Sequence, residues 1–215
     1  TPADKIDTAA PGYDPALFHP LDSGTIRAFK ESQKLPDRFW LFVGTLEPRK
    51  NLVTLIEAYA ALNASNRPAL VIAGGKGWDF EPIFAAVERL KLAESVLFPG
   101  FIPADQLALW YNSAEAFVYP SVFEGFGLPV LEAMACGTPV IVSDTSSLPE
   151  IAEGAGMLIP PHDPSAWTAA LARAADDDTW RRQARERSQE KAARYTWAET
   201  ARVHIESYRK TGLSL

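Results

Sequence analysis

Two acidic residues flank a glycine-rich turn in an otherwise apolar stretch. Residues 120–144 read PSVFEGFGLPVLEAMACGTPVIVSD, with Glu124 inside the turn and Glu132 eight positions later. Acids in the first turn of a helix complement its dipole by about 0.3–1 kcal/mol, so Glu124 could be only a turn residue. The helix expected after the turn is nearly all apolar and should be buried. A buried carboxylate needs a partner, which for Glu132 is either a cation of the protein or a ligand.

The turn itself has the composition of an anion site. Gly125 and Gly127 let backbone N–H groups approach a ligand without obstruction by a Cβ atom. Pro129 suits the first helical turn, where the amide that it lacks would have no intrahelical partner. The N–H groups of Phe126, Gly127 and Leu128 would then point off the helix N-terminus, where anions bind. The two carboxylates could accept hydrogen bonds from hydroxyl groups on either side of that anion.

A pair of cations follows the first strongly apolar run of the chain. The run FWLFVG at 39–44 leads into TLEPRKN, with Arg49 and Lys50 just before the expected start of a helix. Cations beside a helix N-terminus favour an anion, and phosphate in particular. The alternative is a solvated basic pair near the surface, because adjacent Lys and Arg residues are common there.

Alternating strand and helix patterns place both segments in the same kind of loop. Expected strands cover 39–44, 69–75, 96–101, 114–120, 139–144 and 156–160, and expected helices cover 51–62, 80–91, 104–113, 127–136, 148–152 and 164–176. Continuous apolar strands joined by helices predict an α/β fold with a Rossmann-like, doubly wound parallel sheet of about six strands. Ligands of such sheets bind outside the carboxyl ends of the strands, where both segments lie.

Several helix ends carry recognisable capping residues. We expect N-caps at Asn51 and Asp163, and capping boxes at 147–150 and 196–199. Two charged amphipathic helices are expected over 179–211. The second has an apolar stripe of Trp197, Ala201, Ile205 and Tyr208, which predicts packing against the sheet or against a neighbouring domain.

Composition limits the possible functions. The chain has 215 residues, a net charge of −6, three His and one cysteine, Cys136. An acidic surface argues against broad nucleic-acid binding, and one cysteine excludes an internal disulfide and fits a reducing, cytoplasmic setting. These residues offer no Cys/His zinc set, and no apolar run approaches the roughly 20 residues of a membrane-spanning helix. Membrane association would therefore be peripheral at most.

The motifs together resemble those of the family 4 glycosyltransferases. Glu124 and Glu132 match the family's E-x7-E pattern, and FVGTLEPRKNLVTLIEAY, LVIAGG, VLFPGFIPADQLALWYNSAEAFVYPS and LPEIAEGAGMLIPPHD resemble its other blocks. The resemblance covers roughly 37–210. It implies the C-terminal, donor-binding half of a GT-B fold: a connector and leading helix at 1–36, a nucleotide-sugar domain at 37–178, and C-terminal helices at 179–215. The resemblance implies that the N-terminal GT-B domain, the half that this sequence does not include, would be its partner.

The resemblance also implies roles for individual residues. Lys50 would bind the donor diphosphate with help from Arg49, and Ile102 would lie against the base. The turn residues Gly125, Phe126, Gly127 and Leu128 would offer backbone amides. Glu132 would hold the ribose hydroxyls, and Glu124 would face the transferred sugar. Many relatives have Arg where this chain has Thr45, and Arg49 is expected to supply that charge.

The implied reaction is sugar transfer with retention of configuration and with no metal or other cofactor. The donor would be a GDP- or UDP-linked sugar, with GDP-mannose favoured, and the acceptor a growing glycan or a lipid-linked glycan. The full-length protein would act in the cytoplasm, at the inner face of the membrane. A nicotinamide dehydrogenase is disfavoured because FVGTLEPRKN lacks a G-x-G-x-x-G turn. A sugar-nucleotide epimerase and a non-catalytic sugar-nucleotide-binding domain stay open as alternatives.

Overall fold

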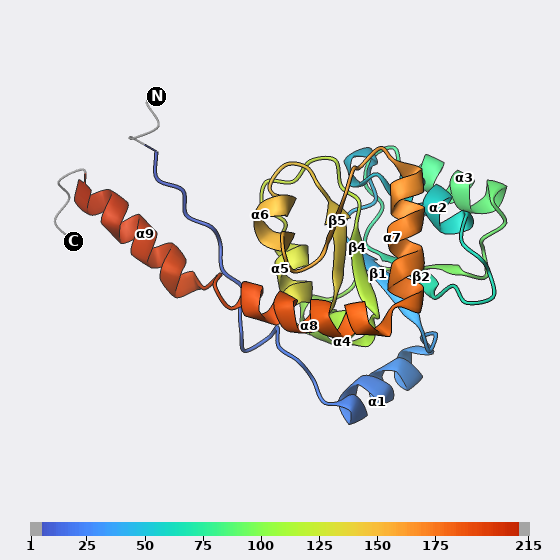
Figure 1. Ribbon diagram of the computed structural model, residues 1–215, viewed down its shortest axis with the longest axis horizontal. Helices are drawn as coiled ribbons and strands as arrows, with labels where there is room; N and C mark the ends of the chain where they lie inside the picture. The colour runs from blue at the N-terminus through green and yellow to red at the C-terminus, as the bar shows by residue number, and fades with distance from the viewer. Residues whose placement is uncertain (1–5, 211–215) are drawn as a thin grey trace.

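A computed structural model describes residues 6–210 of the chain. Its centre is one parallel sheet of six strands in the order β3-β2-β1-β4-β5-β6 (Figure 1). The strands are β1 (Phe39–Val43), β2 (Ala69–Ala73), β3 (Val96–Gly100), β4 (Ala116–Tyr119), β5 (Val140–Ser143) and β6 (Met157–Ile159). Each strand lies within the range expected for it. The predicted α/β, doubly wound fold class is confirmed.

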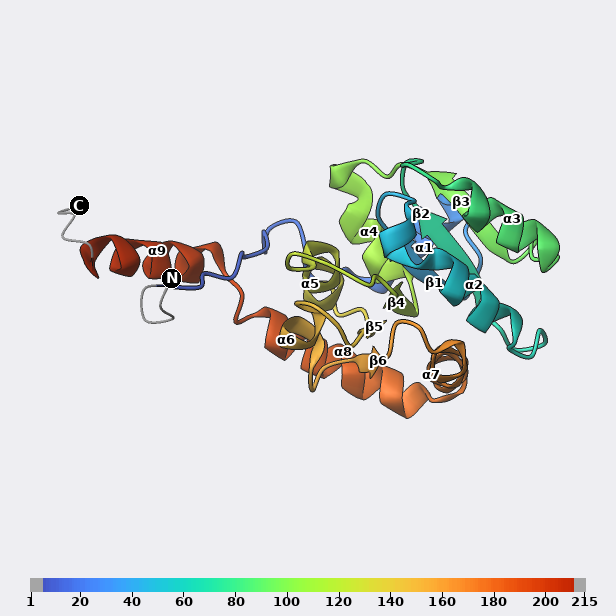
Figure 2. The ribbon, with the colours of Figure 1, turned by 90° about the horizontal axis from the view of Figure 1, so that it is seen from above.

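Helices cover both faces of the sheet (Figure 2). They are α1 (Ser23–Gln33), α2 (Leu52–Ala60), α3 (Glu81–Arg89), α4 (Leu107–Ser113), α5 (Leu128–Ala135), α6 (Leu148–Ala152), α7 (Pro164–Asp176), α8 (Asp178–Ala192) and α9 (Trp197–Lys210), with short 3-10 turns η2 (Pro48–Lys50) and η3 (Ala104–Gln106). α2 packs against α3 and α7, while α5 packs against α4, α6 and α8. The strand order reverses between β1 and β4, which is where open α/β sheets bind ligands.

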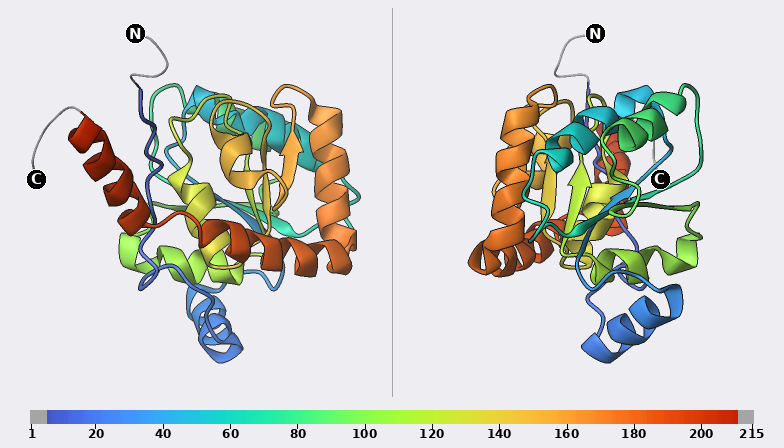
Figure 3. Two further views of the ribbon diagram at one scale, coloured as in Figure 1. Left: turned by 60° about the vertical axis from the view of Figure 1, so that its left-hand side comes forward. Right: turned by 90° about the vertical axis from the view of Figure 1, so that its right-hand side faces the viewer.

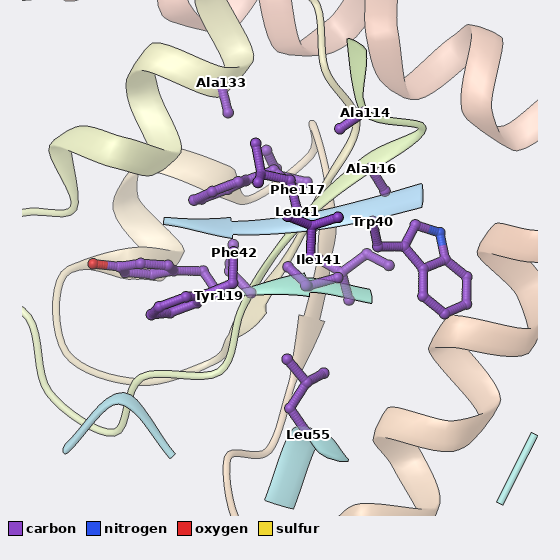
Figure 4. Close-up of a cluster of buried hydrophobic side chains, with 14 of the residues drawn as sticks. Trp40, Leu41, Phe42, Leu55, Ala114, Ala116, Phe117, Tyr119, Ala133 and Ile141 are labelled. Carbon is purple, nitrogen blue, oxygen red and sulfur yellow. The ribbon is translucent and has the colours of Figure 1, made fainter. Parts of the chain in front are cut away.

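The core lies around the two central strands. Trp40, Leu41 and Phe42 of β1 are fully buried, as expected for a strand covered on both faces. The aromatic rings of Phe42 and Phe117 each stack on the ring of Tyr119, with centroids 5.6 and 5.5 Å apart (Figure 4). This stack extends to the carboxyl end of β4 and supports the loops beyond it.

Two of the four expected caps are wrong. Asp163 accepts a hydrogen bond from the N–H of Ala166 at 3.0 Å, as predicted. Asn51 has a left-handed backbone, and its side chain makes no cap bond; its Nδ2 donates instead to the carbonyl of Pro161 at 2.6 Å. Ser147 caps no helix either. At 196–199 the hydroxyl of Thr196 does accept a hydrogen bond from the N–H of Glu199 at 3.1 Å.

The last two helices behave differently. α8 packs against α5, α6 and α7, whereas α9 has no buried residue and projects from the sheet beside the N-terminal segment (Figure 3). Trp197 and Ile205 are exposed, so the expectation that this stripe packs on the sheet is wrong. Packing against a neighbouring domain stays a prediction. Among the residues that the structure covers, no helix is long and apolar enough to cross a membrane.

Candidate functional site

The carboxyl ends of β1 and β4 bring the predicted cations and the glycine turn together. Lys50 ends the short turn η2 after β1, and Glu124 lies in the loop after β4. The Nζ atom of Lys50 is 2.6 Å from Oε1 of Glu124. Backbone bonds also join the two loops, since the N–H of Val122 donates to the carbonyl of Arg49 at 2.9 Å. Residues 74 positions apart in the sequence thus form one site.

Lys50 is buried, which rules out the solvated alternative for this residue. Only 4% of it is exposed. Its Nζ also donates to the hydroxyl of Tyr119 at 2.7 Å and lies 4.8 Å from the centre of that ring. Burial lowers the pKa of Lys50 below its usual value, although Glu124 opposes this effect. A buried ammonium of this kind can bind an anion strongly, because little water competes for it.

Arg49 lies at the outer edge of the same cluster. Its Nη1 is 3.0 Å from Oε1 of Glu124, its Nε is 2.5 Å from Oε1 of Glu47, and 44% of the side chain is exposed. Burial opposes ionisation of Glu124, but Lys50, Ser121 and Arg49 outweigh it and hold the pKa of that carboxyl below its usual value. Glu124 is therefore a carboxylate at neutral pH, and it bridges both cations.

Two serines after β5 hold the glycine turn in place. The N–H of Glu124 donates to Oγ of Ser146 at 3.0 Å. Oγ of Ser147 donates to the carbonyls of Glu124 and Phe126 at 3.1 and 2.8 Å. The sequence assigned Ser147 to a capping box and missed this role, because a bond to another loop has no local signature. The turn needs Gly127, whose φ of +108° favours glycine.

The residues that lead into α5 differ in exposure. Gly125 and Leu128 are exposed, whereas Gly127 is buried. A Cβ atom on Gly127 would lie 2.8 Å from Cδ2 of Leu148. The ring of Phe126 packs against Tyr195 with centroids 5.8 Å apart. The side chain of Phe126 is therefore anchored against Tyr195, in the loop between α8 and α9, whereas Gly125 and Leu128 are exposed at the surface.

Glu132 has a partner that the sequence did not predict. Its Oε2 accepts a hydrogen bond from the hydroxyl of Tyr111 on α4 at 3.0 Å. Within residues 6–210 no cation pairs with it. Burial raises the pKa of Glu132 to about 7, and the bond from Tyr111 only partly offsets this. A neutral phenol leaves the carboxylate able to accept further hydrogen bonds from a ligand.

A cavity of about 320 Å³ lies at the carboxyl ends of β1, β2 and β3. It is lined by Val43, Gly44, Thr45, Gly74, Gly75, Phe101, Ile102, Ala104 and Leu107. Ile102, which was expected to lie against a base, lines this cavity together with Thr45; the contact with a base stays a prediction. Gly74 is required for packing, because a Cβ atom there would lie 1.9 Å from the carbonyl oxygen of Gly44. A larger cavity of about 430 Å³ beside α1 contains none of the predicted site residues.

The described residues contain no group of three or more His, Cys, Asp or Glu side chains that could hold a metal ion. The charged groups at this site are the buried ammonium of Lys50, the partly exposed guanidinium of Arg49 and the carboxylates of Glu124 and Glu132. Such groups can bind a diphosphate and the hydroxyls on either side of it, and they can stabilise a departing phosphate.

Known proteins are similar to this chain in sequence. The model of the group 1 glycosyl transferases matches residues 25–194. The O-antigen chain mannosyltransferase B of Escherichia coli is 34% identical over 97% of this chain and 55% of that protein. A D-inositol 3-phosphate glycosyltransferase of Corynebacterium glutamicum is 36% identical over 92% of this chain and 50% of that protein. The chain spans about half the length of these curated relatives.

Solved structures agree with the family. The sucrose-phosphate synthase of Thermosynechococcus elongatus superposes with a TM-score of 0.82 at 32% identity, over 94% of this chain and 51% of that one. The C-terminal domain of a group 1 glycosyl transferase (LpcC) of Francisella tularensis superposes with a TM-score of 0.76 at 24% identity, over 86% of this chain and all of that one. The predicted GT-B relationship is confirmed, and the chain belongs to the group 1 glycosyltransferases.

Proposed function

We propose that this chain is the donor-binding half of an enzyme that transfers a hexose from a nucleoside-diphosphate sugar to a glycan or lipid-linked acceptor. The observation that carries the proposal is the buried Lys50 ammonium at the point where the strand order reverses. A buried cation needs an anion beside it, and in this structure Glu124, in the turn that leads into α5, contacts both Lys50 and Arg49. A diphosphate would bind the same two cations together with the N–H groups at the start of α5.

Other residues around the diphosphate would then bind the base, the ribose and the sugar of the donor. The cavity beside Ile102 has the size and the apolar walls for a base. Glu132 would accept from the ribose hydroxyls, and Glu124 would take the hydroxyls of the sugar. As the bond from the sugar to the phosphate breaks, negative charge grows on the leaving diphosphate. Lys50 and Arg49 would stabilise that charge without a protein nucleophile.

The curated relatives favour mannose as the transferred sugar. The O-antigen chain mannosyltransferase B and three proteins named serotype-specific mannosyltransferase WbdA, all of Escherichia coli, are 34–35% identical to this chain. We therefore prefer GDP-mannose over UDP-linked donors. The HepE protein of Anabaena, which has the same fold at 19% identity, was solved in complex with UDP-glucose, so both nucleotides belong in the test. The acceptor would sit on the other half of the enzyme, at the inner face of the membrane, and closure of the two halves would assemble the site.

Calorimetric titration of the chain with GDP-mannose and UDP-glucose tests the donor site. We expect binding of at least one donor and a loss of about tenfold or more in affinity for Lys50→Met, because a charge-assisted contact to phosphate is removed. Arg89→Ala is the matched control, since it removes one cation from an exposed ion pair on α3. Failure of both donors to bind, or equal binding by wild type and Lys50→Met, would refute the proposal.

A further inference from the structure

The carboxylate of Glu124 occupies both cations that the proposed function assigns to the diphosphate. Its Oε1 lies 2.6 Å from Nζ of Lys50 and 3.0 Å from Nη1 of Arg49. Side-chain exposure is 5% for Lys50 and 10% for Glu124. The same carboxylate therefore cannot face sugar hydroxyls and also neutralise these cations in this arrangement.

The local charge balance shows what the carboxylate does. Lys50 and Arg49 carry two positive charges, and Glu124 and Glu47 return two negative charges at contact distance. A cluster of zero net charge attracts a diphosphate weakly, although its two cations are correctly placed. The attraction appears only after Glu124 has moved away, because Glu47 contacts Arg49 and makes no ion pair with Lys50.

We propose that Glu124 is an internal competitor of the diphosphate, and that this competition makes the site select sugar nucleotides over free nucleoside diphosphates. This inference rests on the proposed function. A diphosphate that enters displaces Glu124 from Lys50 and Arg49. When the ligand carries a sugar, the displaced carboxylate gains hydroxyl donors. When the ligand is a bare nucleoside diphosphate, the carboxylate loses its cations and gains no partner.

This exchange of partners requires only a small conformational change. Serine hydroxyls hold the backbone of the turn at Glu124 N and O, with distances of 3.0 and 3.1 Å, so a change of side-chain rotamer is sufficient. Tyr119 keeps its 2.7 Å bond from Lys50, so the ammonium stays in position. After transfer the hydroxyls of the sugar are no longer beside the carboxylate, and its return to Lys50 would promote release of the nucleoside diphosphate.

The decisive experiment measures affinities of pyrophosphate, UDP and GDP for the chain and its Glu124→Gln variant. Pyrophosphate removes any contribution of the base or the ribose. We expect the variant to bind all three about tenfold more tightly, as loss of one charge-assisted contact implies. GDP-mannose and UDP-glucose should gain much less or weaken, so that the preference for sugar nucleotides over free nucleotides falls.

Two controls separate competition from a general loss of negative charge. Glu57→Gln removes the same charge from an exposed ion pair with Arg89 and should change no affinity. Glu124→Asp keeps the charge but shortens the reach to Lys50, and it should also tighten pyrophosphate binding. Because this second variant retains a carboxylate in the turn, it keeps the test open even if Glu124→Gln does not fold.

The outcomes are distinguishable from those of the donor-site test. Unchanged or weaker pyrophosphate and nucleoside diphosphate binding by both Glu124 variants would overturn the competition, while Lys50-dependent binding of a donor by wild type would still support the proposed function. Absence of all binding by wild type would overturn both. Tighter pyrophosphate binding by Glu124→Gln alone, with Glu124→Asp behaving as wild type, would reduce the effect to charge and also overturn the competition.

Discussion

Replacing Glu132 with Gln should stabilise the donor-free protein, and only above a defined pH. Burial raises the pKa of this carboxyl from 4.5 to about 7. The neighbouring side chains Cys136 and Tyr111 stay protonated up to pH 8. Burial raises the pKa of Cys136 to about 12 and raises the pKa of Tyr111 well above its usual value. Of these three side chains, Glu132 is therefore the one that titrates between pH 4.5 and 8. Gln is nearly isosteric and can still accept the bond from Tyr111.

The sign and the size follow from linkage. Below pH 4.5 the carboxyl of Glu132 is protonated in the folded and the unfolded chain, and its burial carries no ionisation penalty. Between pH 4.5 and 7 the unfolded chain releases this proton first, so the stability of wild type falls as the pH rises. A pKa of about 7 against 4.5 corresponds to about 3 kcal/mol. This penalty is fully present above pH 7 and is absent from the Gln variant.

Urea denaturation at pH 4.5 and pH 8 measures the effect. The free energy of unfolding of Glu132→Gln minus that of wild type should increase by about 3 kcal/mol between the two pH values, equivalent to a difference in Tm on the order of 10 °C for a chain of this size. Glu57→Gln, in an exposed ion pair, should show a change below about 0.5 kcal/mol. An equal difference at both pH values for Glu132→Gln would refute the reasoning. The same variant should bind the donor more weakly, because the ribose hydroxyls would lose the carboxylate that the proposed function assigns to them. Glu132 would then be a residue that lowers stability and is kept for binding.

Two further predictions concern the glycine turn. Gly127→Ala should lower the free energy of unfolding by about 1–3 kcal/mol in urea denaturation, because φ is +108° and Leu148 blocks a Cβ atom. Gly125→Ala is the control, since a Cβ atom there meets nothing within 4 Å. Equal losses of stability in the two variants would contradict this account. Ser147→Ala should cost about 1–2 kcal/mol and weaken donor binding in calorimetry, because two carbonyls of the turn lose their donor; unchanged donor affinity would show that Ser147 does not position the turn.

The helices and strands of this fold can be predicted from the sequence because each one follows from a local pattern of residues. The four inner strands β1, β2, β4 and β5 are apolar runs that are almost entirely buried. Each helix from α2 to α7 follows a strand within a short loop. Parallel strands joined in this way place all their following loops at one edge of the sheet. The sequence could therefore place Lys50 and Glu124 after strands β1 and β4, and Glu132 on the helix α5 that follows Glu124.

The sequence by itself thus determined the fold class and the six strands. It also named Lys50, Glu124 and Glu132 as candidates for a sugar-nucleotide site, and that assignment stays a prediction. Tertiary structure alone decided how these residues are paired, because β1 lies beside β4 although two strands separate them along the chain. That adjacency buries Lys50 against Glu124 and Tyr119. Three other features also depend on contacts between distant segments. They are the hydrogen bond from Tyr111 to Glu132, the hydrogen bond from Ser147 to the glycine turn, and the exposure of α9. A hydrogen bond or a contact between distant segments leaves no periodic trace in either one, so only the packed chain reveals it.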